Sequence, residues 1–225
     1  NTSLKGAVKT LLGDDVAALF VKASGVAMEA ITPADFVCID HIYLRKLRTL
    51  PSLSDGIMAT EFRLHLLTPA VRLPSIETLM HAFIDDAAVV HTHPTAILTL
   101  TNRTAGEEAV AEALGDTVGT VPYVNAGLAF GRAVADELDR REGCRAIVAM
   151  QHGRITWGAS PQQAYDDTIE MVGRAEEYIR RTRRRVFFMD TATDGSTARA
   201  RYRKIAPLLR GLLSPPSADP DNPQR

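Results

Sequence analysis

The sequence predicts an α/β protein, because short apolar runs alternate with segments whose apolar residues recur at helical spacing. Strands are expected at 17–22, 36–40, 87–90 and 146–150, with a shorter one at 155–157. Runs of this length are typical of buried strands, whereas apolar residues about every 3.6 positions are typical of a helix packed on one face. The chain has 225 residues and 45% of them are hydrophobic, so it can bury a core of its own.

Helices are expected at 40–50, 74–84, 161–183 and 198–213. Ser75 suits the N-cap of the second helix, because a serine hydroxyl can accept a hydrogen bond from a backbone N–H of the first turn. Ser160 suits the same position in the third helix, where Pro161 takes the first turn. The residues expected on the inner face of that helix are Ala164, Ile169, Val172, Ala175 and Ile179.

The C-terminal part of the sequence carries a basic run and a proline-rich end. The arginines of 180–185 suit the C-terminus of the third helix, where positive charge complements the helix dipole. A nuclear or nucleic-acid signal is the alternative. A further strand is expected at 186–189. Residues 1–213 are therefore expected to form a single domain, and residues 214–225 a Pro-rich tail or linker.

The balance of charge restricts the possible partners. The chain has 26 basic and 27 acidic residues and a net charge of -1, so no overall field would attract nucleic acid or an anionic membrane. A small molecule is the expected partner. No apolar stretch approaches the roughly 20 residues of a membrane helix. Cys38 and Cys144 lack disulfide or CxxC spacing, which favours reduced, buried thiols and a cytoplasmic protein.

Three histidines suggest a metal site. His91 and His93 are two residues apart after a predicted strand, so their side chains are expected on the same face. His152 follows the strand at 146–150, and Gly153 after it would permit a tight turn. Three imidazoles leave a metal ion an open position, which is typical of a catalytic site. Without His152, two solvated histidines at a strand end would be the simpler interpretation.

Five short motifs occur in an order that resembles one known family. They are Asn-Thr-Ser at 1–3, Val-Lys-Ala-Ser-Gly at 21–25, Pro-Ser-Ile-Glu at 74–77 with a histidine four residues later, Val-Val-His-Thr-His at 89–93, and Gln-His-Gly at 151–153. Together they resemble the class II aldolase/adducin family, and within it the aldolase part of bifunctional rhamnulose-phosphate aldolase/alcohol dehydrogenases. The resemblance implies a three-layer α/β/α sandwich with a central, largely antiparallel sheet. It also implies a cyclic homotetramer with active sites near the subunit interfaces.

The resemblance further implies roles for individual residues. The family's zinc ligands correspond to His91, His93 and His152, and its catalytic acid/base corresponds to Glu77. The cofactor expected is therefore zinc, although three imidazoles would also suit manganese or cobalt. Taken without the resemblance, Glu77 would be interpreted as a carboxylate that stabilises a helix start. The family's phosphate-binding donors correspond to Asn1, Ser3, Ser24, Gly25 and Ser75; Asn-Thr-Ser at 1–3 would otherwise be interpreted as a glycosylation sequon or a polar loop.

The activity implied by the resemblance is cleavage of a phosphorylated ketose to dihydroxyacetone phosphate and a small aldehyde. The reaction passes through an enediolate whose negative charge the metal offsets, while Glu77 moves the proton. Tyr123 is the first tyrosine after the histidine pair and hence a candidate proton donor to the aldehyde oxygen, although a packed strand-end tyrosine is the simpler interpretation. His81 is expected to orient Glu77 or to pack in the subunit. His41 and His65 are expected to be structural.

Three other functions remain open at the level of sequence. The same residues would serve a sugar-phosphate epimerase, dehydratase or decarboxylase of this family, although Glu77 favours an aldolase because epimerases commonly place aspartate there. A noncatalytic, adducin-like module is a second alternative, which the retention of the three histidines opposes. The chain could also be one half of a bifunctional enzyme. A dehydrogenase half would then lie outside these residues, because they contain no Gly-x-Gly-x-x-Gly.

Overall fold

The computed structural model describes residues 1–182 and 194–213. The chain divides into two units, Asn1–Arg183 and Arg184–Arg225, and the second is described only through its helix. The strand expected at 186–189 and the Pro-rich tail expected at 214–225 lie outside the described residues. The expectation of a single domain over 1–213 stays a prediction.

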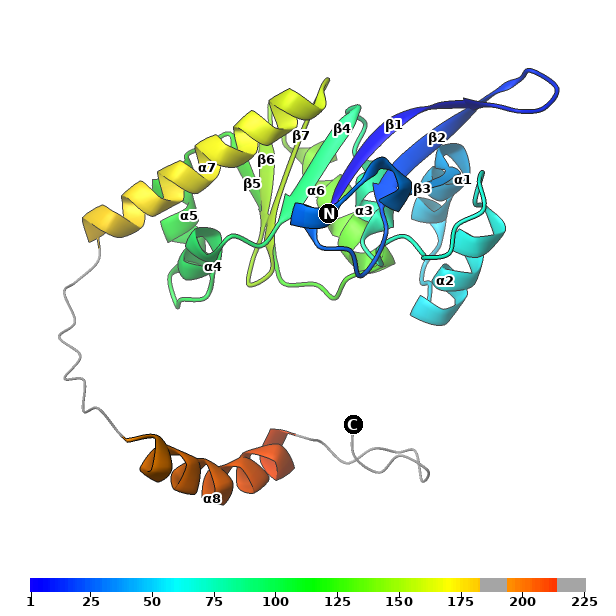
Figure 1. The fold of residues 1–225 in the computed structure, drawn as a ribbon. Helices are drawn as coiled ribbons and strands as arrows, with labels where there is room; N and C mark the ends of the chain where they lie inside the picture. The colour runs from blue at the N-terminus through cyan, green and yellow to red at the C-terminus, as the bar shows by residue number, and fades with distance from the viewer. Residues whose placement is uncertain (183–193, 214–225) are drawn as a thin grey trace. The chain divides into compact units, whose positions relative to one another are not determined.

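A seven-stranded sheet forms the centre of the first unit (Figure 1). The strand order is β3-β2-β1-β4-β7-β6-β5. Neighbouring strands are antiparallel except β5 and β6, which are parallel, so the sheet is largely antiparallel as expected. The strands are β1 (Thr2–Lys9), β2 (Asp15–Lys22), β3 (Phe36–Asp40), β4 (Ala88–Thr92), β5 (Val118–Val121), β6 (Ala146–Ala149) and β7 (Gly153–Gly158).

Helices cover both faces of the sheet, which confirms the three-layer α/β/α architecture (Figure 1). One face carries α1, α2, α3 and α6, and the other carries α4, α5 and α7. The second unit contains α8 (Gly195–Leu213). The helices of the first unit are α1 (His41–Lys46), α2 (Asp55–Leu64), α3 (Thr78–Phe83), α4 (Thr95–Thr101), α5 (Gly106–Leu114), α6 (Leu128–Arg140) and α7 (Pro161–Thr182).

Each helical layer packs on the sheet through its own apolar core. Leu114 and Met171 are buried between the sheet and the layer of α4, α5 and α7. Leu79, Phe130 and Ile155 are buried on the opposite face, against α3 and α6. Burial of one such side chain contributes about 1.5–3 kcal/mol. The strands at the middle of the sheet are therefore held from both sides.

The outer side of β3 is covered by the segment that follows α2. The Asp40 N–H donates to the His65 carbonyl at 3.0 Å, and the Leu67 N–H donates to the Cys38 carbonyl at 3.0 Å. At the opposite side of the sheet, β5 is a strand of 4 residues. Both edge strands therefore expose little unpaired backbone.

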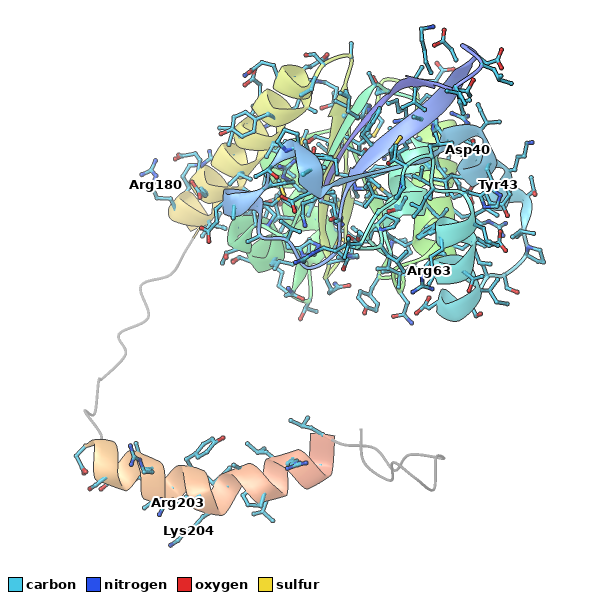
Figure 2. The ribbon with its side chains drawn as sticks, turned by 45° about the vertical axis from the view of Figure 1, so that its right-hand side comes forward. Asp40, Tyr43, Arg63, Arg180, Arg203 and Lys204 are labelled. Carbon is cyan, nitrogen blue, oxygen red and sulfur yellow. The ribbon has the colours of Figure 1, made fainter. Side chains whose placement is uncertain are left out.

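Helix starts differ in part from the expectation. The expected helix at 40–50 begins as α1, whose N-cap is Asp40; its Oδ1 accepts a hydrogen bond from the Tyr43 N–H at 2.9 Å (Figure 2). The prediction that Ser75 caps the next helix is wrong, because α3 begins at Thr78 and Glu77 occupies the N-cap position. The Ser75 Oγ accepts the Glu77 N–H at 3.3 Å, so it stabilises the turn before the helix instead.

The start of α7 agrees with the expectation from the sequence, whereas its buried face is rotated relative to the expected one. The Ser160 Oγ accepts a hydrogen bond from the Gln163 N–H at 3.2 Å, as expected of an N-cap. The prediction that Ile169 lines the inner face is wrong, since Ile169 is 53% exposed. Thr168 is buried in α7 instead. A buried stripe through position 168 follows the helical repeat more closely and leaves Ile169 on the exposed face. The buried apolar residues of α7 are Ala164, Met171, Ala175 and Tyr178, with Val172 and Ile179 partly buried.

α8 agrees with the helix expected at 198–213 and carries basic side chains such as Arg203 and Lys204 (Figure 2). Arg180 and Arg181 lie in the last turn of α7, where the sequence placed them. Among the described residues, no helix combines the length and apolar character that crossing a membrane requires.

The two cysteines differ in burial. Both are free, Cys38 being buried and Cys144 partly exposed. Burial raises the pKa of each thiol, so neither is activated. The expectation of a buried thiol therefore holds for Cys38 alone.

Arg154 of β7 is a fully buried cation with few partners. Its Nη1 donates to the Thr156 Oγ1 at 3.3 Å, whereas Nε and Nη2 have no hydrogen-bond partner among the described residues. Burial lowers the pKa of Arg154 to about 10, against the attraction of Asp167. Asp167 is itself paired with Arg145, so it would keep a partner without Arg154.

We predict that Arg154→Met preserves the fold and raises the free energy of unfolding by about 1–3 kcal/mol, because leaving a buried polar group unpaired costs about that much. Chemical denaturation of both proteins measures the difference. Arg174→Met is the control that removes a partly exposed arginine paired with the exposed Glu170, and it should leave stability unchanged or slightly lower. A clear loss of stability in Arg154→Met would contradict the prediction.

Candidate metal centre

One end of the sheet brings together segments that are far apart in the sequence. β2, β4, β5 and β6 finish at this end, and β1 and β7 begin there. We call it the site end of the sheet. Asn1, the loop after β2, the residues after β4 and the turn between β6 and β7 all lie along it.

His91, His93 and His152 form a compact group at the site end. The ring centroids are 4.7 Å apart for His91 and His93, 5.1 Å for His91 and His152, and 5.0 Å for His93 and His152. One possible ligand atom from each histidine and one from Glu77 lie within 4.8 Å of one another. The structure thus brings together the four residues to which the resemblance assigns metal binding and proton transfer. Their roles stay predictions.

The pairing of β4 with β7 creates this group. Thr92 of β4 lies opposite Arg154 of β7 in the antiparallel register. Because His91 and His93 flank Thr92, their side chains leave the same face of the sheet. His152 directly precedes β7 and so meets them at the strand ends. The ring of Phe130 from α6 packs against His91 and His152, with centroid distances of 5.9 and 4.7 Å.

The turn between β6 and β7 depends on two residues. Gln151 has a φ of 55°, in the left-handed region, and its Nε2 donates to the Thr101 carbonyl at 2.8 Å. The prediction that Gly153 provides the tight turn is therefore wrong. Gly153 is needed for a different reason: an added Cβ would lie 2.5 Å from the Cδ2 of His93. A larger residue would separate β7 from the histidine pair.

Glu77 lies buried between two of the histidines. Its Oε2 is 3.1 Å from the Nδ1 of His91, and its Oε1 is 2.9 Å from the Nε2 of His152. The Asn1 Nδ2 donates to the same Oε2 at 2.6 Å. Three donors therefore hold one carboxylate, which fixes its orientation toward the histidines.

These contacts set the charges of the group. Burial alone would raise the pKa of Glu77, but hydrogen bonds from His152 and His91 outweigh it and hold that pKa well below its ordinary value. Burial lowers the pKa of His91 to about 4, against the attraction of Glu77. Burial and the neighbouring His152 lower the pKa of His93. At neutral pH, Glu77 is therefore ionised and the His91 and His93 rings are neutral, as metal ligands must be.

The donor set fits a divalent cation. The Nε2 of His91 is buried and has no hydrogen-bond partner among the described residues, although a buried ring nitrogen normally has one. Imidazole nitrogens and a carboxylate oxygen are ligand types that zinc accepts in proteins. His93 is the most exposed of the group, so a ligand could approach from its side.

Four of the residues predicted to bind phosphate lie together. The Asn1 Nδ2 donates to the Oγ of Ser75 at 2.8 Å. The loop of Ser24 and Gly25 runs beside the segment before Ser75, since the Ser24 N–H donates to the Leu73 carbonyl at 3.0 Å. Gly25 has a φ of 77°, which favours glycine. Polar groups in such turns can hold an anion, which agrees with the predicted role. Phosphate binding by this loop stays a prediction.

Ser3 lies apart from that loop. It is buried, and its Oγ is hydrogen-bonded to the Nδ1 of His81 at 2.8 Å. The hydroxyl is therefore occupied within the subunit. His81 is fully buried and does not belong to the metal-ligating group. His41 and His65 also lie outside that group, and each bonds a backbone carbonyl.

Lys22 is a charged residue at this loop to which the motif Val-Lys-Ala-Ser-Gly assigned no role. It is buried at the end of β2, and its Nζ donates to the carbonyls of Ala23, at 2.9 Å, and Val26. These carbonyls flank Ser24 and Gly25, so a positive charge lies at the predicted phosphate loop. A lysine two residues before a Ser-Gly turn was the available signal.

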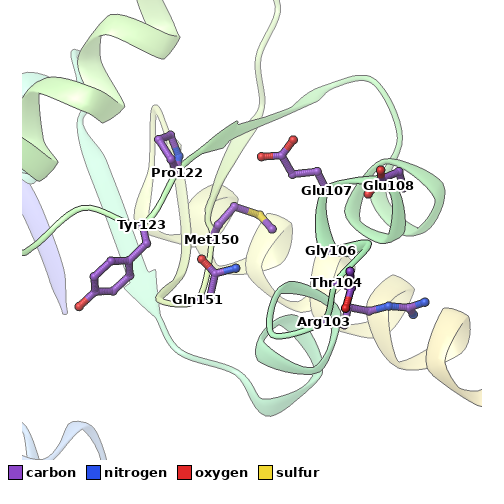
Figure 3. Close-up of a pocket in the computed structure, with 9 residues that line it drawn as sticks. All are labelled: Arg103, Thr104, Gly106, Glu107, Glu108, Pro122, Tyr123, Met150 and Gln151. Carbon is purple, nitrogen blue, oxygen red and sulfur yellow. The ribbon is translucent and has the colours of Figure 1, made fainter.

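Tyr123 follows β5 at the site end and is 60% exposed. The interpretation of a packed strand-end tyrosine is therefore wrong, because the chain leaves the sheet after Val121. Figure 3 shows Tyr123 at one rim of a hollow that Gln151 also lines. The phenol is free to meet a ligand.

Sequence comparison identifies related chains. The family model described as Class II Aldolase and Adducin N-terminal domain matches residues 1–179. The chain is 28% identical over 179 residues to Uncharacterized oxidoreductase YuxG of Bacillus subtilis (strain 168), a match that covers 80% of this chain and 26% of that protein. The chain therefore spans about a quarter of the length of this relative.

Solved structures share the fold. The N-terminal class II aldolase domain of a conserved protein from Thermoplasma acidophilum is 30% identical with a TM-score of 0.74, over 79% of this chain and 82% of that one. The sugar-phosphate aldolase from Thermotoga maritima is 16% identical with a TM-score of 0.58, over 82% of this chain and 87% of that one. The second likeness is one of fold alone.

We predict that the purified chain binds one zinc ion and that His93→Ala weakens zinc binding more than about 100-fold. Losing a hydrogen-bond partner of a metal ligand lowers metal affinity about 10–100-fold, and losing the ligand itself should lower it further. Isothermal titration measures both affinities. His65→Asn is the matched control, since His65 stacks on Tyr43 outside the group. Equal affinity in His93→Ala and the unmodified chain would reject the assignment.

We predict that acid destabilises the metal-free chain between pH 6.5 and about 4. The pKa of His91 falls from 6.5 to about 4 on folding, so the unfolded chain takes up a proton in this range and the folded chain does not. The contribution of His91 to stability is thus complete above pH 6.5 and is lost as the pH falls. Urea denaturation across this range should show a shallower decline in His91→Asn. An identical decline would contradict the shift.

Proposed function

Because the chain belongs to the class II aldolase and adducin family, we propose that it is a metal-dependent aldolase. Its substrate would be a phosphorylated ketose, cleaved to dihydroxyacetone phosphate and a small aldehyde. The observation that carries this proposal is the convergence of His91, His93, His152 and Glu77 within 4.8 Å. A scaffold protein would have no reason to hold three imidazoles around an ionised carboxylate.

His91, His93 and His152 would hold the cation, with Glu77 beside them. A bound divalent cation would supply positive charge that offsets the negative charge developing on substrate oxygens. In cleavage, the ionised Glu77 would receive the proton that leaves the substrate hydroxyl, directly or through Tyr123, and would return it to the carbon of the donor half; in the reverse direction the proton would follow the opposite path. Its ionised state supports the role of base. Its hydrogen bond from Asn1 would keep the carboxylate in place when the histidines bind metal.

The phosphate group would bind at the loop of Ser24 and Gly25, with Asn1 and Ser75 as further donors. Lys22 supports this assignment, because its ammonium group lies at the same loop and would offset the charge of a phosphate. Ser3 contributes less in this proposal, since its hydroxyl is bonded to His81. Tyr123 is exposed and remains the candidate proton donor to the aldehyde oxygen.

The identity of the metal, the oligomeric state and the location of the protein form part of the same proposal. Zinc is the proposed metal because the ligand set is dominated by imidazole. A homotetramer is proposed from the family resemblance, and a cytoplasmic location from the two free thiols. The relative YuxG is named an oxidoreductase, and this chain spans 26% of it, so an aldolase part within a longer bifunctional protein is consistent with the proposal.

An epimerase, dehydratase or decarboxylase would use the same four residues, since a cation held there would offset the negative charge that each of these reactions develops beside a carbonyl. Glu77 favours the aldolase. An adducin-like, noncatalytic module is disfavoured because the complete donor set is retained.

We predict metal-dependent cleavage of a ketose 1-phosphate, lost on chelation and restored by zinc. Glu77→Gln should lower kcat by about 100- to 10,000-fold, the usual contribution of a positioned acid or base. A coupled assay for dihydroxyacetone phosphate measures cleavage. Glu142→Gln, an exposed carboxylate between α6 and the start of β6, away from the site end of the sheet, is the control and should leave kcat unchanged.

Two outcomes would reject the aldolase. Activity on a pentulose 5-phosphate without cleavage of any ketose 1-phosphate would favour an epimerase. A purified chain without affinity for zinc, manganese or cobalt would favour the noncatalytic module.

A further inference from the structure

A polar hollow lies at the site end of the sheet, and one of its lining residues, Gln151, directly precedes His152. It has a volume of about 300 Å³ and is formed by the ends of β5 and β6 and by the α4–α5 loop (Figure 3). Four of its lining residues decide its chemistry: Thr104, Glu107, Met150 and Gln151.

We propose that this hollow binds the hydroxylated end of the aldehyde half of the substrate. The inference rests on the proposed aldolase function and makes it more specific. The substrate would be a ketose phosphate whose chain carries hydroxyl groups beyond the bond that is cleaved, and not one that ends in an apolar group.

The strand order places three kinds of group in a row. The predicted phosphate loop lies at β2 and β1, the histidines at β4 and β7, and the hollow at β6 and β5. Adjacent strands are about 4.7–4.9 Å apart, so the hollow is within one or two strand spacings of His152, on the side opposite the phosphate loop. A ketose phosphate that reaches from this loop past the histidines would extend its remaining carbons into the hollow.

The lining of the hollow presents mainly hydrogen-bond acceptors. Figure 3 shows the carboxylate of Glu107 extending toward Met150 and the amide oxygen of Gln151 on the side of Tyr123, whereas the guanidinium of Arg103 points away from Gln151. Because the Nε2 of Gln151 donates to the Thr101 carbonyl at 2.8 Å, its Oε1 remains as an acceptor. Thr104 adds a hydroxyl that donates or accepts. Sugar hydroxyls donate to such acceptors, whereas a second phosphate would be repelled by Glu107.

Gln151 connects the hollow to the metal centre. Its φ of 55° is uncommon for a residue other than glycine, and strained backbone of this kind is concentrated at ligand sites. The hydrogen bond to α4 holds the strained residue in place. A ligand that contacts Gln151 would therefore lie one residue from the ring of His152.

The first test does not depend on catalysis. The full chain, labelled with ¹³C at its methionine methyl groups and kept metal-free by a chelator, is titrated with erythritol while the Met150 signal is followed. Met150→Leu identifies that signal. We expect a saturable shift, and about 10-fold weaker binding of 1,4-butanediol, which lacks the two inner hydroxyls. Glu107→Gln should weaken erythritol binding about 10-fold, whereas Glu142→Gln, an exposed carboxylate after α6, should bind it unchanged.

The second test uses the reaction. Glu107→Gln should raise KM about 10-fold for a ketose 1-phosphate with hydroxyls beyond the cleaved bond and leave KM unchanged for an analogue without them. No erythritol-dependent shift at Met150, or equal erythritol affinity in Glu107→Gln, would overturn the inference. Erythritol binding without any aldol cleavage would support the hollow and reject the proposed function. Cleavage without erythritol binding would reject the hollow alone.

Discussion

The antiparallel pairing of β4 with β7 is the constraint on which the site depends. His91 and His93 leave one strand and His152 precedes the other, so only the observed register brings their rings within about 5 Å. A slip of one residue would turn the histidine pair to the opposite face of the sheet. β1 and β6 pair with the outer sides of these two strands, and helices pack on both faces. The group is thus built into the middle of a sheet and does not rely on a loop for its position.

Glu77 is the electrostatic centre of this arrangement. A buried carboxylate is costly unless it is paired, and here His91, His152 and Asn1 surround it. Asn1 also bonds Ser75, so one side chain connects the residue proposed to transfer a proton with the loop proposed to bind phosphate. A ligand bound at either place would therefore affect the other through the hydrogen bonds of Asn1. Such preorganisation reduces the rearrangement needed as charge develops.

The sequence predicted the parts of the site that follow a simple period and missed those that depend on tertiary contacts. His91 and His93 were placed together because side chains two apart on a strand share a face, and α7 was marked by a serine, a proline and a long helical stripe. β1 and β5 were missed because glycine and polar residues interrupt their apolar pattern. The helices α2, α4, α5 and α6 were also missed. Ser75 was misplaced since its neighbours form a turn before α3, and Gln151 took the left-handed conformation expected of a glycine because a hydrogen bond to α4 holds it there.

The strand order has a consequence for self-association. A sheet with two free edges can add strands from other copies and grow into fibres. On one side, the segment after α2 already occupies the backbone groups of β3, and on the other, β5 offers 4 residues with a glycine among them. Neither border is a good template for main-chain pairing. If copies of this chain associate, they are therefore expected to do so through side chains and not by main-chain pairing of their sheets.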